Sequence, residues 1–440
     1  MPSLIEKQQN SATKQFRDLN PKSEAQYDAA AQSMPGGNTR SVLFYAPFPL
    51  TMTRGDGANL WDLDGHEYVD FLGEYTACIF GHSHPLIIAE IVGALKTGLN
   101  LSSHTSGEVD LTRAICARFP TFDTVRLTNS GTEANIMALS AARAFTKRPK
   151  IVVFAGAYHG GPLSYVGKAS AANIPYDVVI APYNDLAGTR SLLAGNAGEI
   201  AAILVEPMLG AGGCIAGTQT FLQGLRDWCT ADGALLIFDE VMTSRLHPQG
   251  LQHALGIRPD LTTMGKYLGG GMPIGVFGGR ADIMAQFDPR TTGHLAHAGT
   301  FNNNVLSMRA GLVGLTQVFT QNQATQLTEM GDGFRHRLNQ ICQTSGLPVQ
   351  FTGIGSVMNL HTQVSTIDRP EQVPLENGPL KELIFFGMLR RGYYIARRGL
   401  IALNVCHTQA HLSGFEAAFK DTLDSLQPFV ETKEASGENQ

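Results

Sequence analysis

One lysine stands among glycines directly after a predicted strand. Lys266 lies in the sequence GKYLGGG at residues 265–271, and the predicted strand is at residues 261–264. Glycines leave a lysine accessible, and partial desolvation lowers its pKa toward that of a usable nucleophile. The spacing is not that of a phosphate-binding GxxxxGK[ST] loop. The alternative is a solvated loop lysine, which is what most lysines are.

An acid follows a very apolar run of the chain. Residues 234–238 read ALLIF, and Asp239 comes next, within the sequence FDEV at 238–241. An aspartate at the end of a buried strand is costly to bury without a partner. It could pair with a protonated ring nitrogen of a bound cofactor. The alternatives are a helix N-cap and a surface acid that follows the strand.

The sequence NSGTEAN at residues 129–135 has the composition of an anion pocket. It joins a predicted strand to a predicted helix, where backbone N–H groups and the helix dipole favour negative charge. Gly131 lets a ligand come close, and Ser130 and Thr132 add two hydroxyls. The alternative is an ordinary N-cap, because Ser and Thr are favoured capping residues.

An aromatic residue at another predicted strand end could stack on a flat ring. Tyr158 lies in the sequence GAYHG at 156–160, shortly after the apolar residues 151–154. The alternative is a turn with a half-buried tyrosine. The four segments complement one another, because one cofactor could need a phosphate cradle, a stacking aromatic, an acid for a ring nitrogen and an amine for an aldehyde. A purely structural interpretation would make this ordered set a coincidence.

Short apolar runs alternate with helical periodicity in the middle of the chain. This pattern is typical of an α/β fold with a mostly parallel sheet covered on both faces. Ligands of such sheets bind at the carboxyl ends of the strands, where the polar and glycine-rich segments lie. The sequence predicts helices at 132–146 and 220–230 and strands at 125–128, 151–154, 178–181, 200–205, 234–238, 261–264 and 274–277.

The two ends of the chain have a different pattern of predicted helices and strands. Near the start, a helix is predicted at 23–32 and strands at 50–54, 58–62 and 67–71, with an Asp64-Gly65 turn before the last strand. After residue 304, helices are predicted at 306–319, 324–344 and 380–391, with a β-like segment at 350–360. We expect residues 81–305 to form a large cofactor-binding domain. Residues 1–80 and 306–440 are then the two parts of a smaller domain.

The composition of the chain predicts the compartment of the protein and the kinds of partner that it does not bind. The 440 residues are 43% hydrophobic and 16% charged, with a formal net charge of −5 and a pI near 6.2. No basic stripe predicts binding to nucleic acid or to an anionic membrane. No apolar run reaches about 18 residues, and the N-terminus lacks a signal-peptide pattern. The six cysteines show no CxxC pair and no zinc-like spacing, so we expect reduced thiols, no metal and a cytoplasmic protein.

From about residue 40 to 426 the sequence resembles the class III aminotransferases, which have the aspartate-aminotransferase-like fold of pyridoxal-5′-phosphate (PLP) enzymes, fold type I. The resemblance implies PLP as cofactor, a large domain with a mostly parallel seven-stranded sheet, and a smaller α+β domain built from both chain ends. The motifs that carry it are NSGTEAN at 129–135, YHG at 158–160, EPM at 206–208, FDEV at 238–241, GKYLGGG at 265–271 and GTFNNN at 299–304.

The resemblance implies a role for single residues of these motifs. Lys266 matches the lysine that carries PLP as a Schiff base, and Asp239 matches the acid that keeps the pyridine nitrogen protonated. Val241 and Tyr158 match the residues on the two faces of the ring. The other matches are the phosphate cradle Ser130, Gly131 and Thr132, then His159 and Glu206 beside the cofactor, and finally Thr300. Since Thr300 matches a threonine that binds the phosphate of the neighbouring subunit, a homodimer with shared active sites is implied.

Two branches of the family are most similar, the glutamate-1-semialdehyde aminomutases and the β-amino acid aminotransferases. The sequence RSVLFYAPFP at 40–49 strongly resembles the β-phenylalanine aminotransferases. In those enzymes the arginine matching Arg40 binds the substrate carboxylate. The arginine matching Arg398 binds the distal carboxylate of 2-oxoglutarate and swings away for an aromatic side chain, and Tyr75 matches a pocket residue. A surface salt bridge is the structural alternative for either arginine.

The implied reaction moves an amino group from a β-amino acid such as β-phenylalanine, or from a related amine, to a keto acid such as 2-oxoglutarate or pyruvate. Lys266 would act as the base, and the kinetics would be ping-pong. Three alternatives stay open. They are a glutamate-1-semialdehyde 2,1-aminomutase, an amine transaminase whose substrates lack a carboxylate, and a PLP-binding protein with a sensory or structural role.

Overall fold

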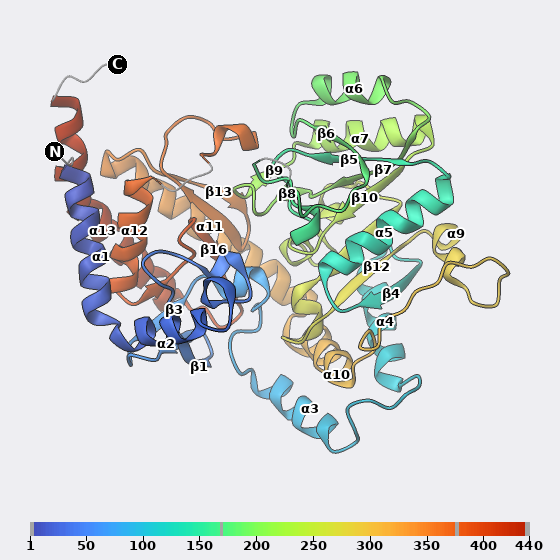
Figure 1. The fold of residues 1–440 in the computed structure, drawn as a ribbon, viewed down its shortest axis with the longest axis horizontal. Helices are drawn as coiled ribbons and strands as arrows, with labels where there is room; N and C mark the ends of the chain where they lie inside the picture. Colours follow the sequence, from blue (N-terminus) through green and yellow to red (C-terminus); the bar gives the residue numbers. More distant parts are fainter. Residues whose placement is uncertain (1–3, 168–169, 375–377, 436–440) are drawn as a thin grey trace.

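A seven-stranded sheet forms the centre of the larger part of the molecule (Figure 1). The computed structural model describes residues 4–167, 170–374 and 378–435. The strand order is β4-β12-β11-β10-β7-β5-β6, and only β12 runs antiparallel to its neighbours, which confirms the predicted mostly parallel sheet. The strands are β4 (Thr124–Thr128), β5 (Lys150–Phe154), β6 (Asp177–Ala181), β7 (Ile200–Val205), β10 (Leu235–Asp239), β11 (Leu261–Gly265) and β12 (Gly275–Gly279).

Helices cover both faces of this sheet, and the strands β7, β10, β11 and β12 at its centre are buried throughout. In β7 all six residues are buried; Ile203 and Val205 pack in one cluster with residues of α7 (Gln219–Asp232), whereas Ala202 and Leu204 pack in another with α5 (Gly131–Thr146). Helix α6 (Leu186–Ala194) lies beside α7 (Figure 1). Side chains of a strand alternate between its faces, so a strand covered on both sides is apolar throughout, as the sequence showed.

The smaller part combines the two ends of the chain. Strand β15 pairs in parallel with β3, with Tyr393 opposite Val69, and helices α1, α12 and α13 lie side by side (Figure 1). The N-terminal elements are α1 (Leu4–Leu19), α2 (Pro21–Ala31), β1 (Met52–Asp56), β2 (Asn59–Asp62) and β3 (Glu67–Asp70). The C-terminal elements are α11 (Gln321–Ser345), β13 (Gln350–Ile354), β14 (Val357–His361), α12 (Pro379–Arg390), β15 (Tyr393–Tyr394), β16 (Leu400–Ala402) and α13 (Gln409–Ala435).

The buried ring of Phe71 ties these two ends together. Its centroid lies 4.5 Å from those of His407 and Phe415 and about 6 Å from those of Phe334 and Tyr393. All four neighbours belong to the C-terminal part of the chain. Aromatic contacts of this kind add to the stabilisation that comes from burial alone. The N-terminal segment is therefore held by a core built from residues more than 260 positions later in the chain.

Several elements differ from the sequence-based expectation. The helix predicted at 306–319 is α10 (Val305–Val313), followed by a π-helical turn at Gly314–Val318. The segment 350–360 is the hairpin β13–β14, and α6, α13, α3 (Pro85–Leu95) and α4 (Ser106–Arg118) were not predicted. Helix α3 reads PLIIAEIVGAL, whose apolar residues lie all round the helix and give no amphipathic period.

The short elements are β8 (Met208–Leu209), β9 (Ile215–Ala216), α8 (Leu251–Ala254) and α9 (Ala281–Met284). Among the described helices none is long and apolar enough to cross a membrane.

Candidate active site

The carboxyl ends of five strands meet at one edge of the large sheet. Strands β11, β10, β7 and β5 are parallel neighbours in that order, so the segments that follow them lie side by side. These segments bring Lys266, Asp239, Glu206 and Tyr158 to the same edge. Strand β4 ends there too, because it pairs with the antiparallel strand β12, and it leads to Ser130. The arrangement is the one that α/β sheets use to bind ligands.

The carboxylate of Asp239 is buried, and three donor groups lie within hydrogen-bond distance of it. Its Oδ2 atom accepts a hydrogen bond from Asn135 Nδ2 at 2.7 Å and lies 2.7 Å from His159 Nδ1. Its Oδ1 atom accepts from the backbone amide of Val241 at 3.0 Å. Bonds to a charged acceptor are stronger than neutral ones, and they offset the cost of burying the charge. The site can therefore hold a fixed negative charge at the end of β10.

Two residues of this network were not predicted from the sequence as site residues. Asn135 also donates to the backbone carbonyl of His159 at 3.0 Å, and its own oxygen accepts from the Thr263 hydroxyl at 2.6 Å. Both residues are buried, Asn135 in α5 and Thr263 in β11. A buried polar side chain needs a partner, and the signal that could have found Asn135 is its place in the motif NSGTEAN at 129–135. Within the described residues, the buried Nε2 atom of His159 has no hydrogen-bond partner.

Lys266 offers an amine with few competing contacts. It is half-buried and has a left-handed backbone with φ of 53°, and its amine makes no hydrogen bond or ion pair with any residue that the structure describes. Its pKa is lowered from the ordinary lysine value, chiefly because burial disfavours the ammonium form. The negative charges of Asp239 and Glu206 oppose this shift, and the positive charge of Arg398 adds to it. A lysine in this setting is suited to act as a nucleophile and as a base.

Glycines hold the start of α5 close to the strand ends. A Cβ atom on Gly131 would come within 2.7 Å of two methyl carbons of Val241, and one on Gly160 would lie 2.2 Å from the hydroxyl of Thr132. Ser130 caps α5 by accepting from the amide of Glu133 at 3.2 Å, which confirms the N-cap interpretation. The cap leaves the first amides of the helix without intrahelical partners. They therefore stay free for an anion.

Glu206 holds the loop that carries Tyr158. Its two carboxylate oxygens accept from the backbone amides of Tyr158 and Gly210, each at 2.9 Å. Burial raises the pKa of Glu206 to about 7, while the nearby His159 lowers it. The ring of Tyr158 remains 47% exposed, so it has a free face beside the strand ends.

The predicted substrate residues lie where the two parts of the molecule meet. The Arg398 guanidinium carbon lies 5.4 Å from the centre of the Tyr75 ring, and the Tyr75 hydroxyl donates to the carbonyl of Val42 at 2.8 Å. A cavity of about 130 Å³ lies among Val42, Tyr75 and Arg398. Arg40 instead forms a half-exposed ion pair with Glu74 at 2.6 Å. The salt-bridge alternative therefore describes Arg40, whereas Arg398 has no carboxylate partner among the described residues.

Thr300 is exposed and stands apart from the other predicted site residues. No described contact joins it to Lys266, Asp239 or the start of α5. The segment that contains Thr300 does contact the loop between β4 and α5, since the Asn129 side chain donates to the side-chain oxygen of Asn302 at 3.0 Å. In a single chain the structure therefore gives Thr300 no role at its own site.

Comparison with known proteins identifies the family. Residues 44–373 match the model of the class-III aminotransferases. The chain is 53% identical to a β-phenylalanine transaminase of Variovorax paradoxus over 92% of its length and 94% of that enzyme. It superposes on a solved β-phenylalanine aminotransferase from that organism with a TM-score of 0.95 and 51% identity, covering 96% and 98% of the two chains.

A glutamate-1-semialdehyde 2,1-aminomutase of Lachnoclostridium phytofermentans is 36% identical over 85% of this chain and 92% of its own. A solved transaminase with bound PLP aligns with a TM-score of 0.86 and 32% identity over 93% and 99%. The protein belongs to the class III aminotransferases, which are PLP-dependent transaminases of fold type I. The residues present fit that cofactor, because the site combines a buried acid, an unpaired amine and a glycine-lined helix start.

Replacing Asn135 with leucine should weaken PLP binding by about 10- to 100-fold. The substitution removes one hydrogen bond to the buried Asp239 carboxylate, and bonds to charged groups contribute about 1.5–3 kcal/mol. Titration of the apoprotein with PLP measures the change. Ser140→Ala is the control on the same helix, because the Ser140 hydroxyl binds only the carbonyl of Ile136. Unchanged affinity in a folded Asn135→Leu protein would contradict this role of Asp239.

Proposed function

We propose that this aminotransferase takes the amino group of a β-amino acid with an aromatic substituent, such as β-phenylalanine, and transfers it to a keto acid such as 2-oxoglutarate. The observation that carries the proposal is the cavity at Tyr75, where the Arg398 guanidinium lies over the Tyr75 ring and Arg40 pairs with the preceding residue, Glu74. Arg40 and Arg398 come from opposite ends of the chain, and the charges of both act on the Tyr75 hydroxyl. Arginine binds carboxylates in a bidentate manner, so the pocket suits substrates with one or two carboxylates.

The residues at the strand ends would hold the cofactor. Lys266 would hold it by condensing with its aldehyde, with loss of water, and Asp239 would pair with its ring nitrogen. Val241 and Tyr158 would cover the two faces of its ring. Ser130, Gly131 and Thr132 at the start of α5 would bind its phosphate, while His159 and Glu206 secure the surroundings of Asp239 and Tyr158.

The reaction needs a proton moved and charges held in place. When bound, PLP supplies an electron sink for the electrons of a broken C–H bond. The Lys266 amine, once free, takes the proton from the amine-bearing carbon, and its lowered pKa keeps the neutral form accessible. The Asp239 carboxylate holds a proton on the ring nitrogen. Arg40 and Arg398 orient the substrate through its carboxylates, and the two half-reactions follow one another in ping-pong order.

A donor half-reaction tests this function. Adding (R)- or (S)-β-phenylalanine to the PLP-loaded protein without a keto acid should bleach its visible absorbance with one enantiomer. The band should return when 2-oxoglutarate is added, since the second half-reaction regenerates the starting form. A band that ignores both enantiomers would refute the proposed donor. Turnover of glutamate-1-semialdehyde without any keto acid would instead favour the aminomutase.

The same assay separates the amine-transaminase alternative. Arg40→Ala should lower kcat/KM for β-phenylalanine by about 10- to 100-fold, because a charge-assisted bond to the carboxylate is lost. 1-Phenylethylamine has no carboxylate and serves as the matched substrate control, for which we expect less than about a twofold change. Equal effects on both substrates would contradict carboxylate binding by Arg40.

We further propose that the enzyme works as a homodimer in which Thr300 serves the site of the second copy. Support comes from an apolar surface on α3, where Leu86, Ile88, Val92 and Leu95 are all exposed, and from Phe301 beside Thr300, which is 55% exposed. Patches of this kind mark protein interfaces. Sedimentation should show a particle of two chains, and Val92→Glu should shift it toward one. A monomer with full transaminase activity would contradict shared sites.

Two expectations from the sequence remain proposals. We place the enzyme in the cytoplasm, which is supported by six cysteines that form no disulfide in the described structure. We also retain the division into a large domain at 81–305 and a small domain from 1–80 and 306–440. The pairing of β3 with β15 supports a small domain made from both ends.

A further inference from the structure

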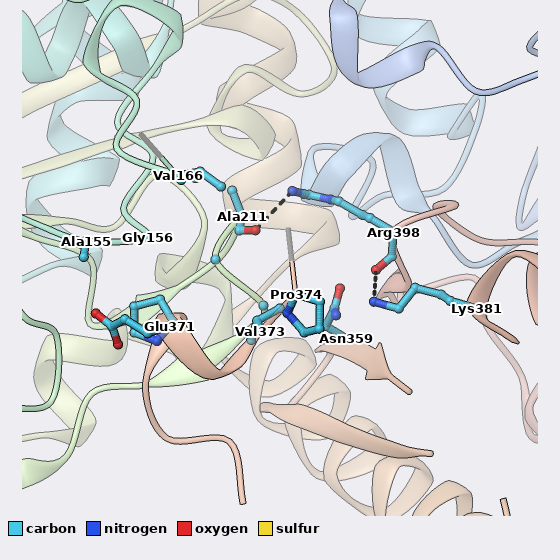
Figure 2. A pocket seen from close by; sticks show the side chains of 14 residues that line it. Ala155, Gly156, Val166, Ala211, Asn359, Glu371, Val373, Pro374, Lys381 and Arg398 are labelled. Carbon is cyan, nitrogen blue, oxygen red and sulfur yellow. Dashed lines mark hydrogen bonds between the residues drawn. The ribbon is translucent and has the colours of Figure 1, made fainter. Parts of the chain in front are cut away.

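A second cavity also has Arg398 in its wall. It has a volume of about 440 Å³ and is bordered by loops of the large sheet, at residues 155–156, 166–167 and 211–213, and by the C-terminal part of the chain (Figure 2). Arg398 lines both this cavity and the smaller one beside Tyr75. Its charge also acts on Lys266. The Arg398 side chain is therefore a wall that the two cavities share.

Lys381 is a buried cation in the wall of this cavity. Its side chain is only 7% exposed, and its single hydrogen bond runs from Nζ to the backbone carbonyl of Arg398 at 3.3 Å (Figure 2). No carboxylate pairs with it among the residues that the structure describes. It is the third residue of α12, where the helix dipole disfavours a positive charge. Neither helix stability nor an ion pair explains a lysine at this position.

The charges around Lys381 indicate that its missing partner is an anion. Arg398 donates only one long bond, at 3.4 Å to the carbonyl of Ala211, and its buried Nε atom has no partner within the described chain. Glu371 is the only acid in the described lining, and it points away from both cations (Figure 2). Burial and the charge of Arg398 lower the pKa of Lys381 to about 8, so it keeps its proton at pH 7. Two unpaired cations in one cavity are costly unless an anion binds there.

We infer that Lys381 is a second cation for the distal carboxylate of a dicarboxylic 2-oxo acid, in addition to Arg398, for which the family resemblance already implies that contact. We infer that Lys381 determines the preference for such an acceptor over a monocarboxylic one. The inference rests on the proposed function, because it concerns the acceptor of that reaction. Lys381 touches neither cofactor nor reacting atoms. It acts on specificity alone, through its charge in the cavity that Arg398 also lines.

Acceptor kinetics at pH 7 test the subsite. In Lys381→Gln, kcat/KM for 2-oxoglutarate should fall by about 10- to 100-fold, the size of one hydrogen bond to a charged group, while the value for pyruvate changes less than about twofold. Lys381→Arg keeps the charge and should keep most of the preference. Lys420→Gln removes an exposed lysine paired with Asp424 on α13 and serves as the control. Equal losses with both acceptors, or no loss with either, would overturn the inference.

A binding measurement without turnover separates this inference from the proposed function. Glutarate has two carboxylates and butyrate has one, and neither can accept an amino group. Calorimetric titration of the PLP-loaded protein should show tighter binding of glutarate, and Lys381→Gln should remove most of that difference. If β-phenylalanine fails to bleach the cofactor while the glutarate preference persists, the donor is wrong and the subsite stands. Equal affinity of the unaltered protein for glutarate and butyrate would refute the subsite.

Discussion

The site depends on keeping one negative charge in the protein interior. The Asp239 carboxylate is buried at the end of β10, and it is stable there only because Asn135, His159 and the amide of Val241 donate to it. Each donor comes from a different element: helix α5, the loop after β5, and the segment after β10 itself. Their convergence fixes how α5 sits on the sheet, and Thr263 completes the arrangement from β11. The cofactor chemistry of the family requires such a fixed charge beside the ring nitrogen. The sheet and its helices therefore position this charged group in addition to forming a hydrophobic core.

The second constraint is that substrate groups must reach this edge from outside the large sheet. Arg40 and Tyr75 come from the start of the chain, and Arg398 and Lys381 come from its end. The β3–β15 pairing and the contacts of Phe71 hold these two ends together, so Arg398 lies over the Tyr75 ring and Arg40 pairs with Glu74 next to it. In the proposed reaction, cofactor residues and substrate residues therefore belong to different parts of the molecule. On that proposal, specificity can change at Arg398 and Lys381 without changes at Asp239 or Lys266.

Much of the large sheet was predictable because its strands are buried on both faces. Runs such as residues 200–205 and 234–238 carry no polar residue, and β7 and β10 form there within one residue of the predicted bounds. Lys266, Asp239 and the start of α5 were predictable because strand ends and glycines mark ligand sites. Helix α3 was missed because apolar residues surround it, and Asn135 was missed because its partners lie 24 and 104 residues away. Lys381 carried no local signal at all, since its environment arises only when α12 packs beside Arg398.

The most direct test of the central claim is to identify the residue that is bonded to the cofactor. Borohydride reduction of the PLP-loaded protein makes the bond permanent, and peptide mass spectrometry then finds the labelled lysine. The account predicts a single label on Lys266, and none when β-phenylalanine has first converted the cofactor to its amine form. A label on another lysine, or an unlabelled protein at saturating PLP, would contradict the assignment of Lys266.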